Sequence, residues 1–153
     1  MSALAVIRPD SWFFPLFLHI AGAMVLVGAL TLASVYLIAS WRSNSVALIR
    51  TAYMSLFYAA LPGYIVFRVG AEWIADKEGL ADSDLTWIGI GYGVSDLGAL
   101  LLIVALVIGG ISVRRMNRGG TPSPIAARIV TGLVSLVLIA YLVAVWAMST
   151  KPA

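Results

Sequence analysis

Four long runs of apolar residues, separated by short polar segments, make up most of this chain. They cover about residues 12–40, 46–73, 87–113 and 125–148. Each run exceeds the roughly 20 residues that an α-helix needs to cross the hydrocarbon of a bilayer. The pattern therefore predicts an all-α membrane protein, with four transmembrane helices in a single domain over residues 1–153.

Residues that cap, bend or break helices lie at informative places between and within these runs. Ser123 suits the N-cap of the fourth helix and Pro124 its first position. Pro62 and Gly63 interrupt the second run and predict a kink there. The connections are short, so we expect neighbouring helices to pack as an antiparallel up-down-up-down bundle.

Composition supports lipid as the solvent of this chain. Of its 153 residues, 61% are hydrophobic and 11% are charged, whereas a soluble domain has about 25% charged residues. The chain has no cysteine, which excludes disulfides, thiolate metal sites and thiol catalysis. The net charge of +3 is dispersed, so we expect a lipid bilayer and no nucleic acid as its partner. No activated nucleophile is recognisable, and we expect no enzyme activity.

The charges of the connections predict the orientation of the chain. The first and third connections contain only basic charges, from Arg42, Arg50, Arg114, Arg115 and Arg118. The second connection, residues 75–84, contains one lysine and four acidic residues. Lysine and arginine are retained on the cytoplasmic side of membranes. We therefore expect a bacterial inner-membrane protein with both termini extracytoplasmic.

Ionisable residues inside the predicted spans are the main functional signal. Such a residue costs roughly 2.5–3.5 kcal/mol at the bilayer centre, so it usually has a partner or a function. His19, Arg68 and Asp96 come from three helices, at roughly 10, 8 and 14 Å below the outer interface if each residue adds 1.5 Å. Glu72 lies one turn beyond Arg68. Their similar depth predicts one polar cluster in the outer half of the bilayer.

Helical periodicity adds two tyrosines to this cluster. Tyr64 shares a stripe of the second helix with Arg68, and Tyr92 shares a face of the third helix with Asp96. Ser95 offers a further hydrogen bond. The expected site for a ligand or ion comprises His19, Tyr64, Arg68, Glu72, Tyr92 and Asp96.

Three interpretations of this cluster remain open. In the first, it binds or conducts a small ligand, an ion or a proton. In the second, an Arg68–Asp96 pair is only a tether between helices, in a structural subunit of a homo-oligomer or larger membrane complex. In the third, Arg68 extends to the interface beside Glu72 and never meets Asp96.

The first helix also carries a family resemblance. Its segment FLHIAGA, residues 17–23, followed by Val27, Gly28 and Ala29, resembles the opening helix of small predicted integral membrane proteins of unknown function in bacteria. It is distantly similar to CopD-type copper-resistance membrane proteins, which are associated with copper uptake. The resemblance implies a four-span fold and singles out His19. As the only histidine, His19 is the only candidate metal ligand, and bis-histidine haem ligation requires a second copy of the chain.

Overall fold

The computed structural model describes residues 9–43, 45–80 and 85–150. Within these ranges every regular element is helical and none is a strand. The short 3-10 turn η1 (Asp10–Trp12) leads directly into the long helix α1 (Phe13–Ser43). The first predicted span is therefore one uninterrupted helix.

The remaining elements complete four long helical segments. The second segment consists of α2 (Val46–Ser55), the π-helical η2 (Leu56–Ala60) and α3 (Leu61–Glu78), joined without a break. The third is α4 (Thr86–Asn117) and the fourth is α5 (Pro124–Thr150). All four segments are long and apolar enough to cross a membrane.

Local chemistry explains where several helices begin and end. The Ser45 hydroxyl accepts a hydrogen bond from the Leu48 N–H at the start of α2, at 3.4 Å. The Ser123 hydroxyl does the same for the Ala126 N–H at 3.4 Å, so the predicted cap of the fourth helix is present. Gly79 ends α3 with a positive φ of 66°, a conformation that glycine adopts without a steric cost.

The predicted interruption at Pro62 takes a different form. Proline has no N–H, so the helix cannot keep its normal i to i−4 bonding there. The structure accommodates this with the π turn of η2, in which the Leu61 N–H bonds to the Leu56 carbonyl. The helix then continues to Glu78, beyond the predicted end at residue 73.

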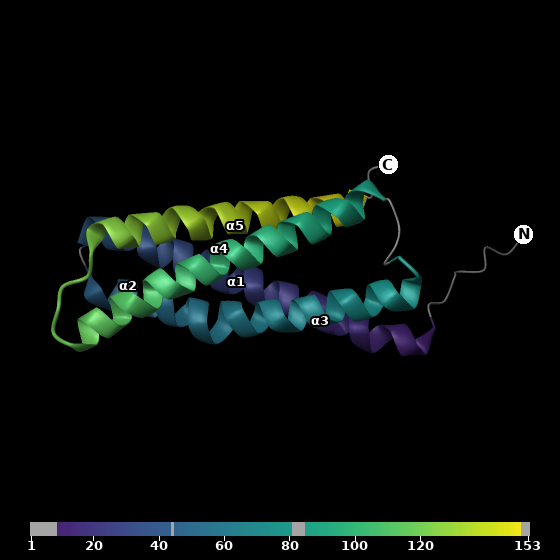
Figure 1. Cartoon of the computed structure of the whole chain (residues 1–153), viewed down its shortest axis with the longest axis horizontal. Helices are drawn as coiled ribbons and strands as arrows, with labels where there is room; N and C mark the ends of the chain where they lie inside the picture. The colour runs from purple at the N-terminus through teal and green to yellow at the C-terminus, as the bar shows by residue number, and fades with distance from the viewer. Residues whose placement is uncertain (1–8, 44, 81–84, 151–153) are drawn as a thin grey trace, which may run out of the picture.

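The long helices lie side by side along the long axis, and the described ends of the chain lie at the same end of the molecule (Figure 1). α1 packs extensively against α3 and also against α2 and α5, while α4 packs against α5. α3 and α4 make only sparse contact with each other. We call the end where α3 stops and α4 starts the acidic end, and the opposite end the basic end.

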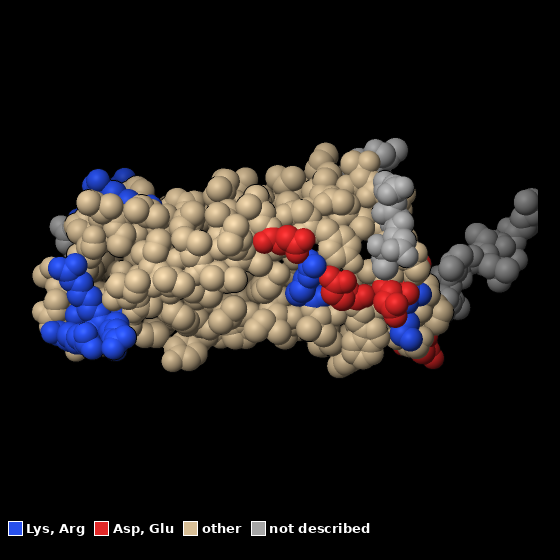
Figure 2. All heavy atoms as spheres, viewed as in Figure 1, with Lys and Arg blue, Asp and Glu red and all other residues tan. Residues whose placement is uncertain are grey.

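Basic and acidic side chains are distributed unequally between these two ends. Arg42, Arg114 and Arg115 lie in the last turns of α1 and α4, at the basic end. Figure 2 shows basic atoms gathered there, and acidic atoms only from the middle of the molecule to the acidic end. Asp82 and Asp84, which contributed to the predicted orientation, lie outside the described residues.

Glycines bring α1 and α3 into backbone contact. A Cβ atom added to Gly22 would lie 2.6 Å from the Cα of Phe67, and one added to Gly70 would lie 2.8 Å from the Cα of His19. Such distances leave no room for a side chain. Small residues permit this close approach, which is a main source of van der Waals attraction between membrane helices. The glycine seam therefore fixes His19 and Phe67 side by side.

Candidate functional site

Four polar side chains from α3 and α4 form what we call the arginine cluster. Arg68 Nη2 lies 2.9 Å from Glu72 Oε1, and Arg68 Nη1 lies 3.1 Å from Asp96 Oδ1. The Tyr92 hydroxyl donates a hydrogen bond to Glu72 Oε2 at 3.3 Å. The guanidinium carbon of Arg68 also lies 5.1 Å from the centre of the Tyr92 ring. The Arg68–Asp96 ion pair and the Tyr92–Glu72 hydrogen bond therefore join the two helices.

Helix geometry explains why these residues meet. Glu72 follows Arg68 by four residues on α3, and Asp96 follows Tyr92 by four residues on α4, so each pair lies on one helix face. Both helices bring their charges to the same level, about 15 Å from the helix ends at the acidic end. The expected contact of Arg68 with Asp96 is present. The interpretation in which Arg68 never meets Asp96 is therefore wrong.

The arginine cluster lies on the outer face of the protein. The side chains of Arg68, Glu72 and Asp96 are 28%, 51% and 66% exposed. In Figure 2 acidic and basic atoms form a row on this face, from the middle of the molecule towards the acidic end. Two carboxylates share one guanidinium, so a formal charge of −1 remains when both are ionised.

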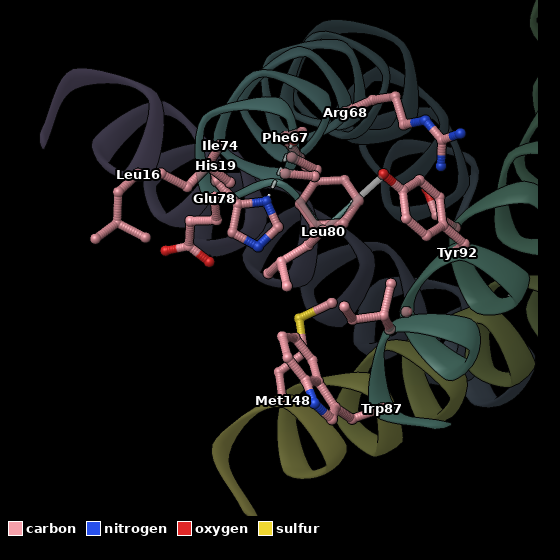
Figure 3. A pocket seen from close by; sticks show the side chains of 15 residues that line it. Leu16, His19, Phe67, Arg68, Ile74, Glu78, Leu80, Trp87, Tyr92 and Met148 are labelled. Atoms are coloured by element: carbon pink, nitrogen blue, oxygen red, sulfur yellow. Dashed lines mark hydrogen bonds between the residues drawn. The ribbon is translucent and has the colours of Figure 1, made fainter. Parts of the chain in front are cut away.

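A cavity of about 230 Å³ lies behind the arginine cluster, at the acidic end. It occupies the space where α3 and α4 are not in contact, and α1 and α5 supply further walls. Most of the lining is apolar. The walls include His19, Phe67, Arg68, Trp87, Tyr92 and Met148 (Figure 3).

His19 presents one ring nitrogen to a fixed partner. Its Nδ1 lies 3.4 Å from the backbone carbonyl oxygen of Phe67, and its ring centre lies 4.8 Å from that of the Phe67 ring. A carbonyl oxygen only accepts, so this hydrogen bond requires the proton on Nδ1. Nε2 then carries a lone pair, and Figure 3 shows it turned towards the side of the cavity where Trp87 and Met148 lie.

Two buried hydroxyl groups at this level lack hydrogen bonds. Ser95 lines the cavity and is 2% exposed, and its Oγ has no partner in the described part of the chain. The hydroxyl of Tyr141, 4% exposed, is also unpartnered there, although it lies close to Ser95. The Tyr141 ring packs edge-on against Phe67, with 5.7 Å between centres. Both hydroxyl oxygens have almost no accessible surface, so they lie behind the cavity wall rather than open to it.

The six residues of the expected site therefore divide into separate groups. Arg68, Glu72, Tyr92 and Asp96 come together, whereas His19 makes no bond with them and instead borders the cavity. Tyr64 belongs neither to the arginine cluster nor to the cavity lining. Its ring centre lies 6.3 Å from that of Phe67.

Sequence reasoning missed several apolar walls of the cavity. Trp87 stands at the start of the third apolar run, a position typical of tryptophans at the membrane interface, which gives no hint of a cavity. Phe67 and Met148 give no signal, because an apolar residue in an apolar helix looks the same whether it faces lipid, a neighbouring helix or a cavity. Only the separation of α3 from α4 identifies these residues as walls of a cavity.

Neither metal geometry nor known relatives assign the site. Among the described residues, no group of three histidine or acidic side chains is placed to hold a metal ion. Comparison with protein-family models, curated proteins and solved structures finds no match. The fold therefore defines the class: a helical protein with four membrane-compatible segments and a cavity at one end.

Proposed function

We propose that this chain is a non-enzymatic integral protein of the bacterial plasma membrane that binds a small ligand in the cavity at its acidic end. Its four long helices cross the bilayer as an antiparallel bundle. The arginines of the basic end face the cytoplasm, following the positive-inside rule, and both termini are extracytoplasmic. The cavity and the arginine cluster then lie in the outer half of the membrane.

The observation that carries the ligand proposal is the preformed, largely apolar cavity with the His19 ring in its wall. Binding sites for small molecules are concave and largely apolar, with a few polar groups that orient the ligand. His19 is such a group here. The arginine cluster supports the site by holding α3 and α4 at a fixed separation.

A cavity-filling substitution tests the proposal. Ala71 lines the cavity, so Ala71→Phe places a ring inside it. Val69, on the same helix, is 53% exposed, and Val69→Phe is the matched control. After purification in mild detergent, mass spectrometry of extracted small molecules should detect a bound compound in the wild type and in Val69→Phe. That compound should be lost in Ala71→Phe; identical extracts from all three proteins would contradict the proposal.

A second candidate, an assembly subunit, is favoured by the exposure of the arginine cluster. Asp96 and Glu72 face outwards, where hydrocarbon solvates ions poorly. A partner helix covering this face would shield them. A stoichiometric partner that co-purifies with the wild type and is lost in Asp96→Leu would establish this role. The haem or copper alternative predicts a coloured protein whose absorption is lost in His19→Ala.

The proposed orientation has its own test. The chain has no cysteine, so single cysteines report accessibility without background. Asp76 is exposed at the acidic end and Asn117 is exposed at the basic end. A membrane-impermeant maleimide should label Asp76→Cys in spheroplasts, and Asn117→Cys only after permeabilisation. The reverse pattern would invert the topology and place the cavity in the inner leaflet.

A further inference from the structure

We infer that the ligand of the cavity is a neutral, lipid-soluble ring compound of the quinone and quinol class. This inference rests on the proposed function and names the chemical class that its site accepts. It comes from three properties of the walls: their charge balance, their shape, and the hydrogen bonds they leave open.

The charge balance disfavours an anionic ligand. Among the described lining residues Arg68 is the only lysine or arginine, and Glu72 and Asp96 already hold its guanidinium. An anionic head group would therefore meet no uncompensated positive charge. Among the described lining residues Glu78 is the only carboxylate, and it has an interaction of its own. A neutral molecule fits this balance.

The shape of the cavity favours a single small ring system. Phe67, Trp87 and Tyr92 contribute aromatic surfaces to the walls, and aromatic rings pack favourably face-offset or edge-to-face. The volume of about 230 Å³ is below the roughly 300–1,000 Å³ of sites for drug-sized ligands. A one- or two-ring head group fits such a space, with an apolar tail left in the lipid.

The open hydrogen bonds match oxygen substituents on such a ring. With its proton on Nδ1, His19 offers a lone pair at Nε2 and accepts a hydrogen bond from a quinol hydroxyl. The reduced quinol form therefore gains a hydrogen bond with His19 that the oxidised quinone form lacks.

Tryptophan fluorescence provides the test, because quinones quench indole emission at close range. In the reporter variant, Trp87 is retained and the other tryptophans are replaced by phenylalanine. Those are Trp12, Trp41, Trp73 and Trp146. In a matched control Trp41, exposed at the basic end, is the retained tryptophan. The probe is decylubiquinone, added to each variant in phosphatidylcholine liposomes.

We expect decylubiquinone to quench Trp87 saturably and Trp41 only in proportion to its concentration in the bilayer. Adding Ala71→Phe should abolish the saturable component. His19→Phe, which keeps a ring against Phe67, should weaken competition by the reduced quinol about fivefold more than it weakens quinone binding, the value of one hydrogen bond.

Parallel, unsaturable quenching of Trp87 and Trp41 would overturn the inference, because it reports partition into lipid alone. If Ala71→Phe nevertheless displaces an extracted compound, the cavity binds a ligand of another class and only the inference fails. Should the four-tryptophan replacement not fold, thermal melting of the full chain with decylubiquinol replaces the fluorescence test. A saturable rise in melting temperature in Val69→Phe but not in Ala71→Phe is then expected, and equal responses would contradict the inference.

Discussion

α3 is joined to its two neighbours in opposite ways. Against α1 it packs backbone to backbone at Gly22 and Gly70, with the rings of Phe14 and Trp73 edge-on, 5.9 Å apart. Against α4 it makes sparse contact, bridged by Arg68 and Asp96 across the front of a cavity. The α1–α3 contact is made by close backbone packing, whereas the α3–α4 contact is made by an ion pair.

The difference separates a close-packed helix pair from a helix pair that leaves a cavity between its members. Lipid tails are as apolar as helix surfaces, so helices associate in a bilayer through close packing and polar contacts rather than through the hydrophobic effect. The α1–α3 seam uses close packing and leaves no space. The α3–α4 joint uses long polar side chains, which hold the helices together without bringing their backbones close.

The largest effect is expected at the glycine seam. Gly22→Ala places a methyl group against the Phe67 backbone, which cannot move without shifting α3. Overpacking of this kind costs about 1–3 kcal/mol in the free energy of unfolding. Gly28→Ala, on the same helix with nothing within 4 Å, is the control and should be neutral or slightly stabilising. Thermal melting in detergent measures both, and equal stabilities would show that the seam is not close-packed.

A smaller effect on stability is expected at the ion pair that joins α3 to α4. Arg68→Gln leaves Glu72 and Asp96 without their cation and should cost about 1 kcal/mol in the free energy of unfolding, the upper range for exposed ion pairs. Asp96→Asn should cost less, because Glu72 still neutralises Arg68. A double-mutant cycle between Arg68 and Asp96 isolates the coupling across the helices. No coupling would show that this pair does not hold α3 to α4.

The smallest effect on stability is expected on the wall of the cavity. Ser95→Ala removes a hydroxyl that has no partner in the described structure, so the free energy of unfolding should change by less than about 0.5 kcal/mol. Ligand binding should also change little, because this oxygen has almost no surface accessible from the cavity. Parallel melting and binding measurements on Ser95→Ala test both expectations. A large loss of stability in the ligand-free protein would mean that the hydroxyl has a structural partner within the bundle.

Several features of this protein follow from local sequence. Long apolar runs predict four segments able to cross a bilayer, because a helix satisfies its own backbone hydrogen bonds in any solvent. The cap at Ser123 is predictable because it acts within one helical turn. The meeting of Arg68 with Asp96 is predictable in part, since hydrocarbon favours pairing of charges at similar depth.

Other features depend on how the helices pack. The sequence places His19 at the right level for the cluster, but the glycine seam turns it to the Phe67 carbonyl and the cavity instead. The π turn that carries the chain past Pro62 is likewise visible only in the structure, because the missing N–H of proline predicts an interruption but not its form. The sequence by itself determined which segments are helices and at what depth their charges lie, because both depend on position along one helix. Only the tertiary structure decided where α3 and α4 separate, because the space between two helices depends on how all the neighbouring helices pack.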